Sequence, residues 1–275
     1  MSDPDWGQAL AAAEPVLLHP HIELQKIGAV ELLRIRREDA LGALGEGMIE
    51  AMTEYATGLA GRPDVRALIL TGTGRSFVAG ADIKIYHGAS LGDFNAYQRR
   101  SRRMFDVIAG LPQATIAAVN GYALGGGFEL ALSCDLILVA DKAKLGLPEI
   151  RLGLLPGGGG TQRLPRLVGA MRAKELIFSG RMISAAEAVE YGAALESCAA
   201  DDLLGRALTL ATELADKAPL ALAEAKRVID DGLEAALPAG LTFEQRVLGA
   251  LYATDDAKEG IAAFVEKRTP NFSAR

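Results

Sequence analysis

Apolar residues along the chain alternate between two spacings, one typical of strands and one typical of helices. Short apolar runs bounded by turn-forming residues predict strands at residues 27–35, 65–71, 115–119 and 135–140. The run at 65–71 is continuous, which indicates a strand buried on both faces. Helical spacing follows two of these runs, with apolar residues at 48, 52, 55 and 59 and again at 94, 97, 105 and 108. Glycine and proline end both helices, at 61–63 and 110–112. This alternation predicts an α/β core.

The pattern changes to helix after helix from about Met171. Ser184 and Glu187 have the spacing of a capping box, Asp202 precedes a further helix, and Pro219 suits a first helical turn. Residues 257–268 form one more amphipathic pattern. We therefore expect a loosely held N-terminal tail at residues 1–20, an α/β core at 21–200 and a helical region at 201–275.

Composition and charge narrow the class of protein. Half of the 275 residues are hydrophobic and 23% are charged, as in ordinary globular proteins. The formal net charge is −6, and the densest basic cluster, "QRRSRR" at 98–103, is typical of a solvated helix face, so we expect no nucleic-acid partner. Two cysteines, Cys134 and Cys198, are too few for a disulfide framework and indicate a reducing compartment. An acidic N-terminus and apolar runs interrupted by charges predict a cytoplasmic protein with no membrane partner.

The most informative stretch is "NGYALGGGFELALSCD", residues 120–135, in which three glycines precede Glu129. The first amides of a helix have no intrahelical partner, and glycines let a ligand approach them closely. A carboxylate one turn later can face the same space. Such a site combines donors for a developing oxyanion with an acid/base group, although a tight turn with a solvated glutamate has the same pattern. The spacing fits neither a phosphate-binding loop nor a dinucleotide fingerprint.

Two further segments have a similar composition. "RSFVAGADIKIY", residues 75–86, places small residues directly after a predicted strand, with Lys84 close by for an anionic group. "LGLPEIRLGLLPGGGGTQRLPRLVG", residues 145–169, has Glu149 ahead of a second glycine-rich turn. Two glutamates beside two sets of accessible amides indicate a site rather than an isolated turn.

These segments resemble the crotonase superfamily, and specifically its enoyl-CoA hydratases. The motifs "FVAGADIK", "NGYALGGGFELALSCD" and "PEIRLGLLPGGGGTQRLPRLVG" match in order and spacing, and "EGIAAFVEKRTPNF" resembles the C-terminal helix of the family. The likeness implies an α/β, crotonase-like spiral of ββα turns followed by a helical trimerisation domain, assembled as a homotrimer or as a homohexamer of two trimers. It also implies a reaction, the addition of water across the C2=C3 bond of a 2-trans-enoyl-CoA to give a 3-hydroxyacyl-CoA.

The resemblance assigns catalytic roles by position. The backbone amides of Ala81 and Gly126 would form an oxyanion hole for the thioester carbonyl oxygen. Glu129 would help to deprotonate the water that attacks C3, and Glu149 would deliver a proton to C2. Gly157 would direct a backbone amide at the catalytic water or at a glutamate.

The resemblance also implies how coenzyme A is bound. The backbone near Ala79 and Ala81 would hold it, with Lys84 toward the 3′-phosphate region. Phe264 and Lys267 match positions that reach the coenzyme A of a neighbouring subunit, although Phe264 could equally be a core aromatic residue on an amphipathic helix. Coenzyme A is part of the substrate, so we expect no further cofactor, and the three histidines do not form a metal-ligand set in the sequence.

Two departures from the family pattern affect these expectations. Gly42 stands where the family often has asparagine, and residues 37–44 contain no proline, which weakens the resemblance of an early segment that contacts coenzyme A. Ile85 and Tyr86 replace a frequent Glu-Met pair ahead of the variable wall of the acyl pocket, so a different chain-length preference is expected.

Several activities remain open within the same superfamily. Isomerases work with a single glutamate, so the presence of both Glu129 and Glu149 favours a hydratase. An enoyl-CoA isomerase, a hydratase-lyase acting on aromatic acyl-CoA and a catalytically silent acyl-CoA-binding scaffold are the alternatives.

Overall fold

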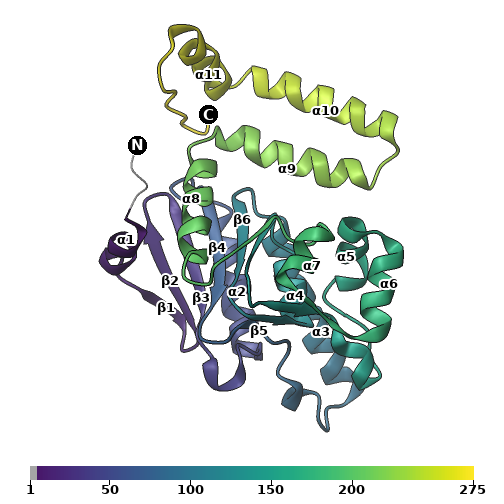
Figure 1. Ribbon diagram of the computed structural model, residues 1–275. Helices are drawn as coiled ribbons and strands as arrows, with labels where there is room; N and C mark the ends of the chain where they lie inside the picture. The colour runs from purple at the N-terminus through teal and green to yellow at the C-terminus, as the bar shows by residue number, and fades with distance from the viewer. Residues whose placement is uncertain (1–4) are drawn as a thin grey trace.

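The computed structural model describes residues 5–275 as two β-sheets covered by helices, with a helical arm beyond them (Figure 1). The seven-stranded sheet contains, in spatial order, β1 (Val16–His19), β2 (Ile22–Ile27), β3 (Val30–Ile35), β4 (Ala67–Gly72), β6 (Ala114–Val119), β8 (Leu136–Ala140) and β11 (Glu196–Cys198). The four-stranded sheet contains β10 (Met182–Ser184), β9 (Lys144–Gly146), β7 (Tyr122–Leu124) and β5 (Ser76–Val78). The helices are α1 (Trp6–Ala12), α2 (Glu46–Leu59), α3 (Leu91–Ala109), α4 (Gly126–Ala131), α5 (Gly160–Val168), α6 (Ala170–Ser179), α7 (Ala185–Glu190), α8 (Leu203–Ala215), α9 (Pro219–Leu233), α10 (Leu237–Tyr252) and α11 (Asp255–Glu266). Three 3-10 helices are η1 (Glu38–Ala40), η2 (Ile83–Ile85) and η3 (Pro148–Leu152).

The core is a spiral in which each turn adds one strand to each sheet. β4, β6 and β8 lie side by side in the larger sheet, and β5, β7 and β9, which follow them in sequence, lie side by side in the smaller sheet. A helix closes each turn: α3 after β5, α4 after β7, and η3 with α5 after β9. The predicted α/β class and ββα spiral are confirmed. Since β3, β4, β6 and β8 are parallel, successive turns bring equivalent loops to the same edge of the core.

Side chains along the central strands alternate between two apolar clusters. On β4, Leu68 and Leu70 belong to the cluster that contains residues of α2 and α3, whereas Ala67 and Ile69 belong to the cluster that contains residues of α8. All six residues of β4 are buried. The continuous apolar run in the sequence therefore marks a strand covered on both faces, as predicted.

The long helices α2 and α3 match the sequence pattern, whereas the shortest strands do not. α2 and α3 end at Leu59 and Ala109, just before the predicted stop signals. The strand expected at 27–35 is present as β3 but starts later, at Val30, because Gly28 turns the chain with φ +60° after β2, which pairs with β3 in antiparallel register. The pattern also misses the three-residue strands, of which β10 and β11 interrupt the expected succession of helices, because three residues cannot show a period.

The segment before residue 20, which the sequence predicts as a tail, contains regular elements in the residues that the structure describes. This segment forms α1 and β1, and β1 pairs with β2. Trp6 and Leu10 pack against the cluster beneath α8, and Trp6 Nε1 donates a hydrogen bond to Thr209 Oγ1 at 2.9 Å. Trp6 and Leu10 are the large apolar residues of α1 that pack against this cluster, and two residues are too few to show a helical period in the sequence. Residues 1–4 lie outside the described part.

The C-terminal helices divide into one that covers the core and three that extend from it. α8 begins after Asp202 and buries Ala207 and Leu208 against the larger sheet, whereas α9, which starts at Pro219 as predicted, pairs with α10 beyond the sheets (Figure 1). Lys226 Nζ lies 2.8 Å from Asp135 Oδ1 and links α9 to the start of β8. Large apolar side chains are exposed along α9, α10 and α11, namely Ile229, Leu233, Leu237, Leu241, Leu248, Tyr252, Ile261, Phe264 and Val265. Within residues 5–275, every helix is too short or too polar to cross a membrane.

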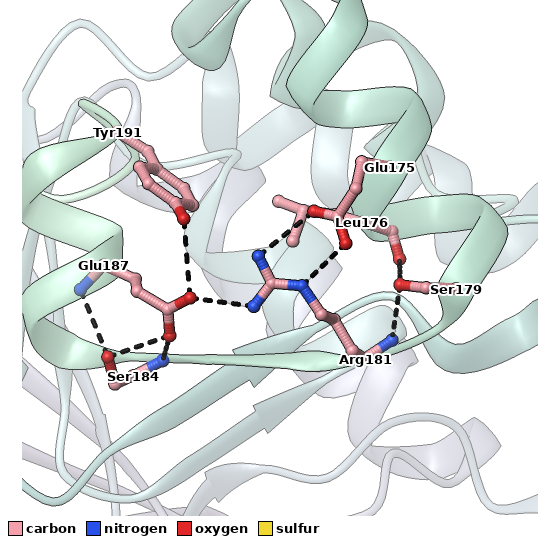
Figure 2. A network of polar contacts seen from close by, with 7 residues as sticks. All are labelled: Glu175, Leu176, Ser179, Arg181, Ser184, Glu187 and Tyr191. Atoms are coloured by element: carbon pink, nitrogen blue, oxygen red, sulfur yellow. Dashed lines mark hydrogen bonds and ion pairs between the residues drawn. The ribbon is translucent and has the colours of Figure 1, made fainter.

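A polar network holds the outer edge of the smaller sheet (Figure 2). Arg181 donates to Glu175 of α6 and to Glu187 of α7, at 2.7 and 2.8 Å. The predicted capping box between Ser184 and Glu187 is confirmed, and its backbone hydrogen bond, followed by the Arg181 guanidinium, lowers the pKa of Glu187 to about 2. β10 pairs with β9, so this network supports the strand that leads directly to Glu149.

We predict that Thr209→Val lowers the free energy of unfolding by about 1 kcal/mol, because it removes the acceptor for the Trp6 indole N–H. Trp6 is the only tryptophan in the chain, so its fluorescence reports the docking of α1. Its emission in the folded protein should be blue-shifted from that in urea, and Thr209→Val should reduce the difference. Thr57→Val on the exposed side of α2 is the control. Identical tryptophan emission in folded and unfolded protein would contradict the docked position.

Candidate active site

A cavity of about 510 Å³ lies where the loops after β5, β7 and β9 meet. The lining includes most of the residues predicted for the site, namely Ala79, Ala81, Gly126, Glu129, Glu149 and Gly157. Apolar and aromatic side chains form much of the remaining wall, among them Leu44, Tyr86, Phe94, Tyr97 and Phe105. The fold thus brings the three sequence motifs to one enclosed space.

Two of the three glycines of the first turn, Gly125 and Gly127, are required sterically, whereas Gly126 is not. Gly125 has φ +52°, and a Cβ there would lie 2.7 Å from Glu149 Oε1. A Cβ on Gly126 would lie 3.7 Å from the amide nitrogen of Ala81. A Cβ on Gly127 would lie 1.8 Å from the carbonyl oxygen of Val78, which no side chain can tolerate. Gly125 and Gly127 therefore allow α4 to begin directly against β5, with the Gly126 amide close to the loop that follows β5.

The amides of Ala81 and Gly126 are both available to a ligand. Gly126 is the first residue of α4, and neither amide donates a hydrogen bond within residues 5–275. The Ala81 loop is held by its neighbours instead: Leu44 N donates to Gly80 O at 2.9 Å, and Asp82 N donates to Leu44 O at 3.0 Å. Two unpartnered N–H groups that face one cavity are suited to bind an oxyanion.

The early segment that departs from the family pattern still supports this loop. Gly42 has φ +73°, and a Cβ there would lie 2.8 Å from the carbonyl oxygen of Phe77, so glycine suits this position. Arg37 pairs with Asp82 at 2.7 Å and also donates to Ala43 O at 2.7 Å. These contacts fix the segment before α2 against the loop that presents the Ala81 amide.

Glu129 is buried, and backbone amides orient its carboxylate. The side chain is 3% exposed, and Glu129 Oε1 accepts hydrogen bonds from Gly158 N at 2.7 Å and Gly160 N at 2.8 Å. Oε2 accepts no hydrogen bond within the described residues, so it is free to contact a ligand in the cavity. Burial raises the pKa of Glu129, and the two amides oppose this shift by stabilising the carboxylate.

Glu149 is also largely buried, but its carboxyl group has fewer hydrogen-bond donors around it than that of Glu129. Its Oε2 is buried and has no hydrogen-bond partner within residues 5–275. Burial, reinforced by the charge of Glu129, raises the pKa of Glu149 to about 7. The carboxyl group of Glu149 is therefore protonated in a large fraction of molecules at neutral pH, which suits a proton donor.

Other amides than that of Gly157 hold a glutamate, so a contact of the Gly157 amide with the catalytic water remains the prediction for that residue. Gly157 lines the cavity, but the amides that reach a glutamate belong to Gly158 and Gly160. The four-glycine run before α5 was the signal for them, because the first amides of that helix lack intrahelical partners. A Cβ on Gly158 would lie 2.2 Å from the Phe105 ring and 2.7 Å from Glu129 Oε2, so this position requires glycine for packing as well.

Three residues predicted to bind coenzyme A lie outside this cavity. The side chain of Lys84 is exposed on η2, two residues before Tyr86 in the cavity wall. Phe264 and Lys267 lie at the C-terminal end of α11, and Phe264 is 85% exposed. The core position considered for Phe264 is therefore wrong.

Aromatic side chains form the far wall, at the segment where the sequence departs from the family pattern. The Tyr86 ring packs edge-on against Phe94 and Tyr97, with ring centroids 5.1 and 5.4 Å apart. Burial raises the pKa of Tyr86 to about 12, and Gln98 Nε2 lies 3.4 Å from its hydroxyl oxygen. Tyr86 is recognisable in the sequence as a departure from the family pattern, whereas no sequence signal marks Gln98, which also lines the cavity.

We predict that Glu149→Gln changes how stability depends on pH. The pKa of a glutamate is about 4.3 in an unfolded chain, whereas that of Glu149 in the folded chain is about 7. Between these values the folded protein binds more protons than the unfolded chain, so the native free energy of unfolding falls as pH rises. The glutamine variant lacks this loss, and its melting temperature should rise relative to native protein from pH 5 to pH 8.

Differential scanning calorimetry across that range measures the effect, and Glu190→Gln at an exposed position of α7 serves as the control. A constant difference in melting temperature between native protein and Glu149→Gln would contradict the raised pKa.

Comparison with known proteins identifies the family. The profile of the family described as Enoyl-CoA hydratase/isomerase matches residues 25–275. A probable enoyl-CoA hydratase of Mycobacterium bovis is 42% identical over 251 residues, which are 91% of this chain and 96% of that protein. The crotonyl-CoA hydratase of Syntrophomonas wolfei is 37% identical over 260 residues, which are 94% of this chain and 100% of that protein.

A solved structure agrees with these sequence relationships. The crystal structure of an enoyl-CoA hydratase from Bacillus anthracis superimposes with a TM-score of 0.90 at 38% identity, covering 93% of this chain and 100% of that one. The resemblance inferred from the motifs is confirmed: the chain belongs to the enoyl-CoA hydratase/isomerase family.

Proposed function

We propose that this protein is an enoyl-CoA hydratase, which adds water across the C2=C3 bond of a 2-trans-enoyl-CoA to give a 3-hydroxyacyl-CoA. The observation that carries the proposal is the contrast between two carboxyl groups in one cavity. Glu129 is held by two backbone amides, and Glu149 has a raised pKa and an unpartnered oxygen. The printed names of the relatives, which include enoyl-CoA hydratases and a crotonyl-CoA hydratase, support the same reaction.

The thioester carbonyl oxygen would accept hydrogen bonds from the amides of Ala81 and Gly126. Attack of water at C3 moves negative charge onto this oxygen as an enolate. Amides that are already in place stabilise that charge without reorganisation, and each such donor is worth roughly 3–4 kcal/mol in other enzymes. The steric role of Gly127 is part of this mechanism, because it lets α4 approach the Ala81 loop.

Proton transfer would divide between the two glutamates. Glu129 Oε2 accepts a proton from the water whose oxygen bonds to C3, while the amides on Oε1 hold the carboxylate in place. Glu149 gives its proton to C2 as the enolate collapses. The proton gained by Glu129 and the proton lost by Glu149 balance, and exchange with solvent restores the starting state. No electron is transferred, so the proposed reaction includes no cofactor beyond the coenzyme A of the substrate.

Retention of the second glutamate distinguishes this proposal from an isomerase. Double-bond migration moves a proton between two carbons and needs no water at C3. Here Glu149 and Glu129 line the same cavity. Glu149 can donate a proton to C2, while Glu129 can accept one from the water that attacks C3. This arrangement supports hydration more directly than migration.

The C-terminal region would complete the site through assembly. Exposed apolar side chains on α9, α10 and α11 provide a surface for other copies of the chain, as a homotrimer or a homohexamer. Phe264 and Lys267 lie outside the cavity of their own chain, so we propose that they contact the coenzyme A bound by a neighbouring subunit. Lys84 is exposed beside the loop that presents Ala81 and would bind a phosphate of the same molecule.

We predict that Glu149→Gln and Glu129→Gln each lower kcat for crotonyl-CoA hydration by about 10²- to 10⁴-fold, since each removes one proton-transfer step. KM should change far less, because coenzyme A supplies most of the binding. Loss of the conjugated thioester absorbance measures the reaction, and Glu190→Gln on exposed α7 is the matched control. Near-native turnover by either active-site variant would overturn its assigned role.

Phe264→Ala should raise KM for crotonyl-CoA several-fold with little change in kcat, because the residue contacts the ligand and not the reacting carbons. Sedimentation velocity of the same variant tests whether the side chain also supports assembly. Lys258→Ala, at an exposed position near the start of α11, is the control. Unchanged KM together with unchanged sedimentation would argue against an intersubunit position.

A further inference from the structure

A second hollow lies on the other side of one wall of the catalytic cavity. It is an open groove of about 660 Å³ along α3, lined by Asn95, Gln98, Arg99, Arg102, Arg103, Asp106, Val107 and Gly157. Gln98 and Gly157 also line the catalytic cavity. The two spaces are therefore neighbours that share a wall.

Gln98 is the side chain in the wall that the two spaces share, beside the backbone of Gly157. A Cβ on Gly157 would lie 3.0 Å from Gln98 Oε1, so the glutamine side chain rests against the glycine backbone. On its other side Gln98 Nε2 is 3.4 Å from the Tyr86 hydroxyl oxygen, at the outer limit of a hydrogen bond. A glutamine so weakly held can change rotamer, and the absence of a side chain on Gly157 leaves room beside it.

The groove is positively charged in a protein whose formal net charge is −6. Its one lining carboxylate, Asp106, already pairs with Arg102 at 2.8 Å and with Arg163 at 3.2 Å. Arg99 and Arg103 form no ion pair within residues 5–275. They lie four residues apart on α3, so both guanidinium groups project from the same helix face.

We propose that the catalytic site accepts acyl groups that end in a carboxylate, and that Arg99 and Arg103 bind this carboxylate in the groove beyond Gln98. The proposal rests on the hydratase function proposed above and names a substrate class for it. The aromatic wall formed by Tyr86, Phe94 and Tyr97 would contact the methylene groups of the chain. A planar guanidinium binds a carboxylate through two parallel hydrogen bonds, which suits recognition of a chain end.

The test compares 2-enoyl-CoA thioesters of increasing length in matched pairs, one member ending in a methyl group and the other in a carboxylate. We expect kcat/KM to favour the carboxylate by about tenfold at one length, since a charge-assisted pair is worth this much at an accessible site. The preferred length reports how far the arginines lie from the reacting carbons. Because Arg99 and Arg103 are exposed, added salt should reduce the preference.

A double variant, Arg99→Gln with Arg103→Gln, should abolish the preference and leave kcat/KM for crotonyl-CoA within about twofold of native, since that short chain cannot reach the groove. The matched control is Lys142→Gln with Arg206→Gln, which removes two positive charges from exposed positions elsewhere. It should retain the preference.

Hydration of crotonyl-CoA without a preference for carboxylates at any length would overturn this inference and leave the hydratase proposal intact. A preference that survives in the double variant would also overturn it. Failure to hydrate every substrate, crotonyl-CoA included, would instead contradict the hydratase proposal on which the inference rests.

Discussion

The close approach of α4 to β5 is the constraint on which the rest of the site depends. It is possible only because Gly127 has no Cβ, which would otherwise overlap the carbonyl oxygen of Val78. The same approach sets the Gly126 amide beside that of Ala81 and directs Glu129 toward the second glycine turn. Room for Glu149 above Gly125 follows from the same absence of side chains. A backbone feature thus determines where the two unpartnered amides and the two carboxyl groups lie.

Electrostatics then gives the two carboxyl groups different properties within one cavity. Burial raises the pKa of both, and backbone amides oppose this shift at each, but only Glu129 has an oxygen that accepts from the amides of Gly158 and Gly160. Glu149 has no such donor on its buried Oε2, and the nearby charge of Glu129 raises its pKa further. Two carboxyl groups in one cavity thus differ in how readily they hold a proton, because their hydrogen-bond partners differ, as the proposed acid and base roles require.

Two exposed surfaces outside the cavity would contribute to the proposed function. One is apolar and would contact other copies of the chain, and the other is positively charged and would contact the substrate. The arm formed by α9, α10 and α11 exposes many large apolar side chains while the sheets carry the buried core. The arginines of α3 collect positive charge next to the acyl cavity of an otherwise acidic protein. Both features lie outside the catalytic centre, and both would act on the parts of a substrate that do not react.

The α/β class, the long helices, the central buried strands, the glycine turns and the two glutamates could all be predicted from the sequence. These follow from local chemistry: a period of 3.6 or 2, a capping pair such as Ser184 and Glu187, and glycine where a backbone must be approached. Tertiary structure alone decided the short strands, the docking of Trp6 on α8 and the exposure of Phe264. It also decided which amides reach Glu129. Those contacts join residues far apart in the chain, and their geometry depends on how the spiral stacks rather than on any local pattern.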